Sequence, residues 1–314
     1  MAFCWLAIIL GAPFFFYGGP GYYSSRSFKA AWDLGHVLFF FLGSSLLWSR
    51  VRGQQQKRSL WHAAGLLFGV VLLAGIGIEL VQQRLGGRSV SFFDLLRNML
   101  GCLAAFCWLI LPREVAGSGM HGTVWRRVVL TAAGITFFLL IFTAVPLSRA
   151  LLDEHRARKQ FPVLSDFQSS MEVERWQGRV HYDRQMARHG KGAMRVQLTT
   201  AKYSGASLMY FPHDWRDFTW LCLSVFKVDE EPMCLHCRIH DSNHGDHGRV
   251  FTDRFLQRFE LQQGWNDLQI SLDAVRKSPA TRLMDMAQIE GLGFFVTRQQ
   301  RPRTIYIDHV YLVR

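Results

Sequence analysis

The sequence lacks every short motif that would identify a common enzyme class. It holds no nucleophile elbow, phosphate-binding P-loop, HExxH zinc motif or kinase signature, so no specific reaction is supported by a motif. It also lacks a basic helix and an RNA-binding aromatic motif, although its net charge is +12. The Lys and Arg residues are scattered or stand in short loops beside apolar runs, where they face lipid headgroups. We therefore expect a lipid bilayer as a partner and no nucleic acid.

Cysteine is scarce, and its placement argues against redox chemistry. Of six cysteines, half lie in apolar runs, where a thiol behaves as a small hydrophobe. Cys222, Cys234 and Cys237 lie outside those runs, and an odd number leaves at least one thiol without an internal partner. Cys234 and Cys237 stand in a segment that alternates like a strand, so their odd spacing directs the two thiols to opposite faces. A bridge from Cys222 to one of them stays open.

The mean hydropathy of +0.07 averages over two unlike halves. Up to about Pro146 apolar runs alternate with short basic or glycine-rich loops, whereas charged residues recur every few positions from Leu151 onward. We predict a membrane all-α helical bundle over residues 1–148, a charged stem over 149–160 that prolongs the last helix, and an all-β jelly-roll sandwich over 161–314.

The apolar runs predict about five transmembrane helices, since a span needs about 17–25 residues to cross the hydrocarbon. The first run has neither the basic start nor the cleavage site of a signal peptide, so we expect a retained helix. Gly65 and Gly69, which are four residues apart, predict close helix packing. The five spans are 3–18, 31–49, 60–81, 94–111 and 124–147.

Basic residues set the expected orientation. Those after the second and fourth spans number seven, against four in the other two loops, so the former loops are predicted to be cytoplasmic. The N-terminus is then cytoplasmic and the sandwich lies on the opposite side. Successive spans cross the membrane in opposite directions, which gives a further expectation whichever side is cytoplasmic. The start of the second span, the end of the third and the start of the fourth all lie on the side of the membrane where the sandwich lies.

Polar residues gather at those three helix ends. Several lie three or four positions apart and so share a helical face. Ionisable groups at a membrane are costly unless they are paired or face a wet cavity, so the set is a candidate site. It serves either as an acid–base site using His36, Glu79 and Asp94, with Arg88 holding an anionic headgroup, or as a polar lock of the bundle. The members are Asp33, His36, Glu79, Gln82, Arg88, Asp94 and Asn98.

The same residues carry a resemblance to a known family. Asp33-Leu-Gly-His36, Glu79-Leu-Val-Gln82 and, after Arg88, Asp94-Leu-Leu-Arg-Asn98-Met-Leu-Gly101 resemble the VanZ-like family over residues 1–112. Leu34 stands where that family usually has a basic residue. The resemblance implies a small bacterial membrane protein with a link to teicoplanin resistance. It implies no defined reaction. Together with the orientation given by the basic loops, it leads us to expect a multi-pass protein of the inner membrane whose C-terminal domain is periplasmic or extracytoplasmic.

The second half has short alternating runs with turn residues between them and no long helical pattern, which is typical of a sandwich or jelly roll. The predicted strands are Ala193–Thr200, Ser207–Phe211, Thr219–Val228, Met233–Asp241, Arg254–Leu261, Asp267–Leu272, Gly291–Thr297 and Thr304–Val313.

Short motifs in this half resemble galactose-binding-like jelly rolls found among carbohydrate-binding modules, which implies glycan binding without catalysis. They are Asp166-Phe167, Trp215, Arg238-Ile-His-Asp241, Asp253-Arg254-Phe255, Gly264-Trp265-Asn266, Arg282-Leu-Met-Asp285 and Tyr306-Ile-Asp308.

Sugar binding needs aromatic faces and planar polar groups. The candidates for both are Trp215, Trp220, Arg238, His240, Asp253 and Arg254. A structural role for them is the alternative. In it Trp220 and Trp265 belong to the core, Asp253 and Arg254 form an ion pair, and Arg282 with Asp285 fixes a loop.

Several of these residues border a His/Asp-rich segment. The run from His240 to His247 contains metal-ligand types but also the Gly, Asn and Ser of a solvated turn. We expect no metal there, no structural calcium at Asp166 or Asp308, and no cofactor.

Two functional hypotheses follow. In the first, the sandwich binds an envelope glycan or glycolipid near the polar mouth of the bundle. In the second, the bundle is an enzyme that acts on a lipid-linked envelope precursor. A structural anchor is a third possibility. The sequence indicates neither the ligand nor the oligomeric state.

Overall fold

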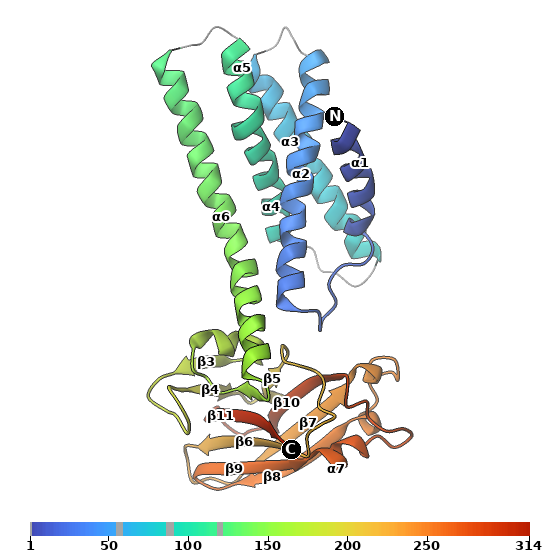
Figure 1. Cartoon of the computed structure of the whole chain (residues 1–314), viewed down its shortest axis with the longest axis vertical. Helices are drawn as coiled ribbons and strands as arrows, with labels where there is room; N and C mark the ends of the chain where they lie inside the picture. The colour runs from blue at the N-terminus through green and yellow to red at the C-terminus, as the bar shows by residue number, and fades with distance from the viewer. Residues whose placement is uncertain (1, 55–58, 86–90, 118–121) are drawn as a thin grey trace. The chain divides into compact units, whose positions relative to one another are not determined.

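The computed structural model describes residues 2–54, 59–85, 91–117 and 122–314. The chain divides into two compact units, Met1–Ala150 and Leu151–Arg314. The first unit is helical and the second is built mainly from strands (Figure 1). The division between an all-α half and an all-β half is therefore as predicted.

Four described helical segments are long and apolar enough to cross a membrane: Arg26–Arg50, Leu60–Arg84, Phe92–Gly117 and Thr123–Gln160. They overlap the second to fifth predicted spans, which are confirmed as helices. The elements of this unit are α1 (Ala2–Gly11), η1 (Ala12–Phe15), α2 (Arg26–Gln54), α3 (Leu60–Leu85), α4 (Phe92–Ala105), a π-helical turn (Phe106–Ile110), α5 (Leu111–Gly117) and α6 (Thr123–Gln160).

The first predicted span, residues 3–18, is shorter than expected. Helix α1 has 10 residues, a rise of about 15 Å, which is half the thickness of the hydrocarbon core. Pro13 lies in the first turn of η1, where it has no N–H to continue the α-helical ladder. The chain then leaves the helix, and Gly18 adopts a left-handed φ of 76°.

Close packing between α2 and α4 depends on Gly101. A Cβ at this position would lie 2.3 Å from the backbone oxygen of Val37, so only glycine permits the approach. Among the described residues, no atom lies within 4 Å of such a Cβ at Gly65 or Gly69, so these glycines do not pack closely against the described helices and the prediction that they do is wrong. The bundle core around this contact contains Phe40, Trp48, Leu67, Phe106 and Ile110, among others.

Helix α6 continues without interruption through Pro146 to Gln160, so the charged stem prolongs the last helix as predicted. Its apolar stretch is exposed on many sides, with Leu130, Phe138 and Phe142 at 62%, 71% and 77% exposure. From Leu151 onward the helix belongs to the second unit. There Asp153 and Arg175 form a fully buried ion pair with N–O distances of 2.8–3.0 Å.

The second unit is a sandwich of two antiparallel sheets (Figure 1). One sheet has the order β3 (Val180–Asp183), β4 (Ala193–Leu198), β11 (Arg303–Val313), β6 (Trp220–Lys227), β9 (Gly264–Ser271), with β1 (Val163–Ser165) also paired to β11. The other has the order β2 (Trp176–Gly178), β5 (Tyr203–Leu208), β10 (Ile289–Thr297), β7 (Met233–Asp241), β8 (Phe255–Leu261).

Seven of the eight predicted strands overlap observed strands closely, and the range of β7 is identical to its prediction. The exception is Ser207–Phe211, because β5 begins four residues earlier at Tyr203 and ends at Leu208. Strands β1, β2 and β3 were not predicted, since three or four residues give too little alternation to detect. Short helical turns also occur at Ser170–Arg175, Ser242–His244, Phe251–Asp253 and Leu272–Arg276.

Strand β7 shows how alternation builds the sandwich. Met233, Leu235, Cys237 and Ile239 enter the core, so the residues between them face away from it. Cys234 and Cys237 therefore lie on opposite faces, as predicted. The cysteines of the sandwich are free thiols, and burial raises the pKa of the Cys237 thiol.

Candidate functional site

The bundle brings six of its seven predicted polar residues to one end, where η1 and the adjoining ends of α2, α3 and α4 meet. The seventh, Arg88, lies outside the described residues. A residue that the sequence analysis did not single out, Arg97, holds two of the six together. Its guanidinium donates to Asp33 at 2.7 Å and to Asp94 one turn earlier on α4. Spacing along single helices could not reveal a bridge between two helices.

The histidine of this cluster is also held by a partner. His36 Nδ1 lies 3.0 Å from Oδ1 of the fully buried Asn98. The ring of Phe15 meets that of His36 edge-on, with centroids 4.8 Å apart. The backbone oxygen of Phe15 accepts a hydrogen bond of 2.7 Å from Gln82 Nε2. Polar contacts thereby tie η1 and α4 to the two other helices.

Glu79 anchors the start of α4. Its Oε2 accepts the N–H of Ser91 at 2.8 Å, and Ser91 in turn caps the helix by accepting the N–H of Asp94. The second carboxylate oxygen of Glu79 and Nδ2 of Asn98 are buried without a hydrogen bond. These contacts favour the polar lock over acid–base chemistry, because no carboxylate hydrogen bonds to His36 in the part of the chain that the structure describes.

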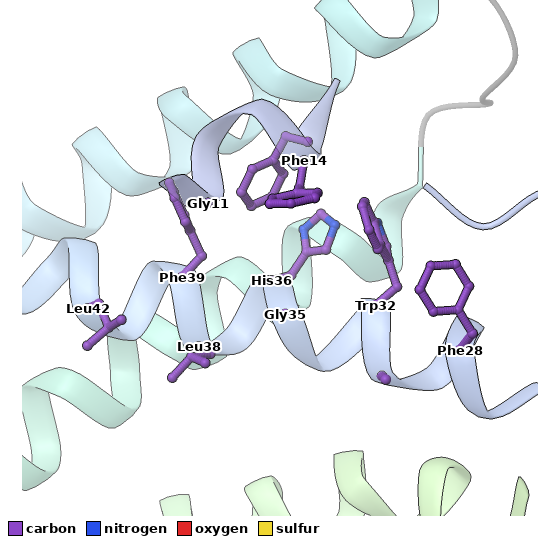
Figure 2. A pocket seen from close by; sticks show the side chains of 11 residues that line it. Gly11, Phe14, Phe28, Trp32, Gly35, His36, Leu38, Phe39 and Leu42 are labelled. Atoms are coloured by element: carbon purple, nitrogen blue, oxygen red, sulfur yellow. The ribbon is translucent and has the colours of Figure 1, made fainter. Parts of the chain in front are cut away.

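A cavity of about 370 Å³ lies on the other side of His36. Figure 2 shows aromatic side chains of α2 and of the segment after α1 gathered around this space. Apart from His36 the wall is almost entirely apolar, and it includes Phe14, Phe28, Trp32 and Phe39. Its chemistry suits a hydrocarbon chain better than a sugar.

The sandwich holds a second candidate site on the side of its five-stranded sheet that faces away from the core. We call this the outer sheet face and define it by Tyr203, Ser207, His236, Arg238, His240, Arg254 and Phe295. Three of the predicted sugar-binding residues, Arg238, His240 and Arg254, belong to it.

Strand register sets the rows of this face. Ser207, Gly293 and Arg238 are aligned across β5, β10 and β7. A Cβ on Gly293 would lie 3.0 Å from Ser207 Oγ and 3.6 Å from a terminal nitrogen of Arg238. A Cβ on Gly291 would lie 2.2 Å from the His240 ring. The glycines thus leave a floor over which the polar side chains extend.

The next row is aromatic. Phe295 of β10 stacks on His236 of β7 with ring centroids 5.1 Å apart and an interplanar angle of 15°. Tyr203 meets the edge of Phe295 at 5.7 Å and is 62% exposed. Such rings can cover the apolar faces of a sugar. The sequence analysis missed all three, although His236 occupies the same face of β7 as the predicted Arg238 and His240.

Positive charge dominates the third part of the outer sheet face. The Arg254 guanidinium lies 4.7 Å above the Phe251 ring, and burial together with the nearby Arg238 lowers its pKa. Burial and then Arg238 lower the pKa of His240 to about 3, so this imidazole is neutral at pH 7. The Nε atoms of Arg238 and Arg254 are buried without a hydrogen-bond partner.

Two predicted sugar contacts are wrong. Trp215 is fully buried in the core and donates its Nε1–H to the backbone oxygen of Pro212 at 3.0 Å. Asp253 is 3% exposed and pairs with Arg282 at 2.7 Å, so neither is free to meet a ligand. The core around Trp215 and the partner Arg282 of Asp253 come from segments that are distant in the sequence, so the sequence alone does not indicate them.

The structural alternatives also need correction. Asp253 pairs with Arg282 and not with Arg254, and Arg282 also binds Asp241. Arg282 therefore fixes this region through two carboxylates, while Asp285 contributes only its backbone N–H to Asp241 at 2.7 Å.

Trp220 was one of the candidate sugar contacts, with a core position as its alternative. It is 42% exposed and lines a cavity of about 710 Å³ with Arg216, Asp273 and Arg276. It lies on the other sheet and so forms no part of the outer sheet face.

The His240–His247 run does not converge on a metal site. His244 pairs with Asp253 at 3.2 Å, and His240 lies over Gly291. In the described ranges, Asp166, His189 and His309 have ligand atoms within 4.8 Å of one another. The rings of His189 and His309 are stacked at 4.5 Å and 16°, so their ring planes do not meet at a common ion. We assign no metal to them.

No protein-family model matches the chain, and no curated protein matches it in sequence. Among solved structures, the sandwich resembles an exo-β-agarase at 13% identity, covering 48% of this chain and 24% of that one, with a TM-score of 0.38. It also resembles the family 11 carbohydrate-binding module of Clostridium thermocellum, solved with a β-1,3-1,4-mixed-linked tetrasaccharide, at 14% identity, 48% and 94% coverage and a TM-score of 0.36. These likenesses concern the fold alone.

Proposed function

We propose that the chain is a multi-pass membrane protein whose sandwich binds a glycan on the outer sheet face. One observation carries the proposal: this face combines the exposed ring of Tyr203 and the partly exposed ring of Phe295 with the Nε donors of Arg238 and Arg254, which have no hydrogen-bond partner within the described protein. A buried donor without a partner costs about 1–3 kcal/mol. Sugar hydroxyls would satisfy such donors, while Tyr203 and Phe295 cover the apolar side of the ring.

The membrane part of the proposal rests on composition and exposure. Four long apolar helices are present, and the side chains of Leu130, Phe138 and Phe142 are exposed to an extent that is unusual in water. In a bilayer these side chains would contact lipid, and α6 would need no further protein cover.

The topology of the proposal differs from the sequence-based expectation at the N-terminus. If the chain crosses the membrane four times, the segment before α2 and the sandwich lie on the same side of it. Five crossings would place them on opposite sides. The distribution of basic loops supports the proposal that the side where the sandwich lies is extracytoplasmic. The resemblance to the VanZ-like family supports a bacterial membrane and a role in teicoplanin resistance or envelope maintenance. An extracytoplasmic sandwich in such a membrane would meet an envelope glycan or glycolipid, which we propose as its ligand.

The decisive experiment is a glycan array probed with the full chain in detergent. We expect binding to a subset of glycans that Tyr203→Ala weakens. Trp220→Ala is the matched control, because it removes an exposed aromatic ring from the other sheet. If no glycan binds, or if Trp220→Ala abolishes binding while Tyr203→Ala leaves it intact, the outer sheet face is not the site.

Fractionation tests the membrane part separately. We expect the chain to remain in the membrane pellet after an alkaline carbonate wash, and the sandwich to be cleaved by protease added to spheroplasts. Release by carbonate would contradict insertion, and protection from protease would contradict the orientation. Teicoplanin susceptibility of a deletion strain tests the link to resistance.

A further inference from the structure

Two guanidinium groups on the outer sheet face have no counter-charge. Neither Arg238 nor Arg254 forms an ion pair with a residue in the described ranges, whereas Arg97, Arg175, Arg282 and Arg303 each do. Both are partly buried, and the Nε of each lacks a hydrogen bond. Partly desolvated cations without a partner are costly, so their retention on one face needs an explanation.

Two acids that neighbour this face in the sequence are already neutralised. Asp241 and Asp253 bind Arg282 through both of their carboxylate oxygens. Hydrogen bonds from Arg282 hold the pKa of Asp253 below its usual value. Asp241 accepts a further N–H from Asp285. Neither carboxylate is available to the two guanidiniums of the outer sheet face.

The positive charges of Arg238 and Arg254 also repel each other. Burial is the main cause that lowers the pKa of Arg254, and the charge of Arg238 is the next. Like charges that share a partly desolvated region repel each other, and an anion between them would remove both the repulsion and the missing hydrogen bonds. An aromatic face lies beside this region, since the Arg254 guanidinium is 4.7 Å from the centroid of the Phe251 ring.

Geometry indicates where the anion would lie. Arg238 extends across the floor at Gly293 toward Ser207, because both side chains border the position of a Gly293 Cβ. A guanidinium and a hydroxyl thereby converge beside the aromatic row of Phe295 and Tyr203. Guanidinium groups bind carboxylate, sulfate and phosphate oxygens in a bidentate manner.

We propose that the outer sheet face selects an acidic glycan, with the oxyanion of one sugar between Arg238 and Arg254 and its ring on the aromatic row. This inference rests on the proposed glycan-binding function and names its ligand class. The oxyanion is either the carboxylate of a uronic acid or a sulfate or phosphate ester, which share the same donors.

Calorimetric titration of the full chain in nanodiscs tests the inference with three probes: an oligogalacturonate, a sulfated galactan oligosaccharide and a neutral mixed-linked glucan tetrasaccharide. We expect at least one acidic probe to bind about 10-fold tighter than the neutral one, because charge-assisted hydrogen bonds exceed neutral ones in strength. The acidic probe that binds more tightly identifies the carboxylate or the ester as the natural group.

Variants separate a specific site from general attraction to a basic protein. Arg238→Gln with Arg254→Gln should reduce acidic-probe affinity about 10-fold or more, and should reduce it by a clearly larger factor than any neutral-probe affinity, because the neutral sugar loses hydrogen bonds without losing a counter-charge. Arg195→Gln, an exposed arginine on the other sheet, is the matched control and should change neither. Arg238→Lys, which keeps the charge without the planar fork, should retain part of the affinity.

The outcomes distinguish two failures. Equal binding of neutral and acidic probes, or an equal effect of Arg195→Gln, would overturn the inference while leaving glycan binding in place. Absence of binding to all three probes would overturn it together with the proposed function. Thermal melting of each variant shows whether a lost affinity reflects lost folding.

Discussion

The polar cluster of the bundle and the outer sheet face of the sandwich both collect polar residues, but they satisfy them differently. In the bundle, Asp33, His36 and Glu79 each have a protein partner within hydrogen-bond distance. On the outer sheet face, Arg238 and Arg254 have buried nitrogen atoms without one. The bundle residues are mostly paired across helices, although Glu79 Oε1 and Asn98 Nδ2 have no hydrogen bond. The two arginines of the outer sheet face have no ion-pair partner in the described ranges, and these are the groups that we propose bind a ligand.

The largest effect should come from a saturated pair in the second unit. Asp153→Ala removes the carboxylate that holds the fully buried Arg175 at 2.8 Å and leaves it with the more distant Glu172, at 3.9 Å. We expect the free energy of unfolding to fall by about 3–5 kcal/mol, because the buried guanidinium loses its close counter-charge. Chemical denaturation of the full chain measures it. Glu154→Ala, at the neighbouring and more exposed carboxylate, should cost far less. A loss below about 1 kcal/mol for Asp153→Ala would show that the pair is not a lock.

Acidification should destabilise the sandwich through His240 of the outer sheet face. Burial and Arg238 lower the folded-state pKa of His240 to about 3, while its unfolded value is about 6.5. Below pH about 6.5 His240 binds a proton in the unfolded chain but not in the folded chain. The free energy of unfolding therefore falls by a few kcal/mol between pH about 6.5 and pH about 3. Melting temperatures between pH 7 and 4 test this. His240→Gln should flatten the profile, and an unchanged slope would contradict the assignment.

A substitution in the polar cluster of the bundle should have an intermediate effect, on stability and not on glycan binding. Asn98→Ala removes the hydrogen bond to His36 inside the bundle, and we expect a loss of about 1–3 kcal/mol with glycan binding unchanged. Gln83→Ala, an exposed polar residue on α3, is the control. His36→Ala and Asp94→Asn, assayed with lipid-linked envelope precursors, sharpen the contrast. Turnover that these variants abolish without loss of stability would favour an enzyme over a lock.

The smallest effect concerns affinity alone. Phe295→Ala removes the ring between His236 and Tyr203, and we expect glycan affinity to fall about 10-fold, as for the loss of one aromatic contact. Phe226→Ala on the other sheet should leave affinity unchanged. Calorimetry measures both. Equal losses in the two variants would remove the distinction between the sheets.

The fold was largely predictable because both halves have strong hydrophobic periods. Helical spacing placed Asp33 with His36 and Glu79 with Gln82, and alternation gave the range of β7 and the opposite faces of Cys234 and Cys237. Helix α1 was overestimated because residues 3–18 remain apolar beyond the point where Pro13 ends the helix. Hydropathy measures composition and does not detect a missing N–H.

The sites were predictable only in part, since partners come from other elements. Arg97 was overlooked because its bridge to Asp33 crosses between α4 and α2. Trp215 resembled a sugar-binding residue in sequence, yet its surroundings make it core. The outer sheet face became visible only once register aligned Phe295 with His236 and Gly293 with Arg238.

Gly101 has a consequence for how genetic variation in this protein should be interpreted. It lies about one turn after Arg97 and Asn98, and the close approach that it allows to Val37 holds α4 against the α2 turn that carries His36. A methyl group there would push two helices apart and break two polar contacts together, although every polar side chain would remain unchanged. A Gly101→Ala allele would therefore behave in a screen like a multiple substitution in the cluster, without altering one of its functional groups.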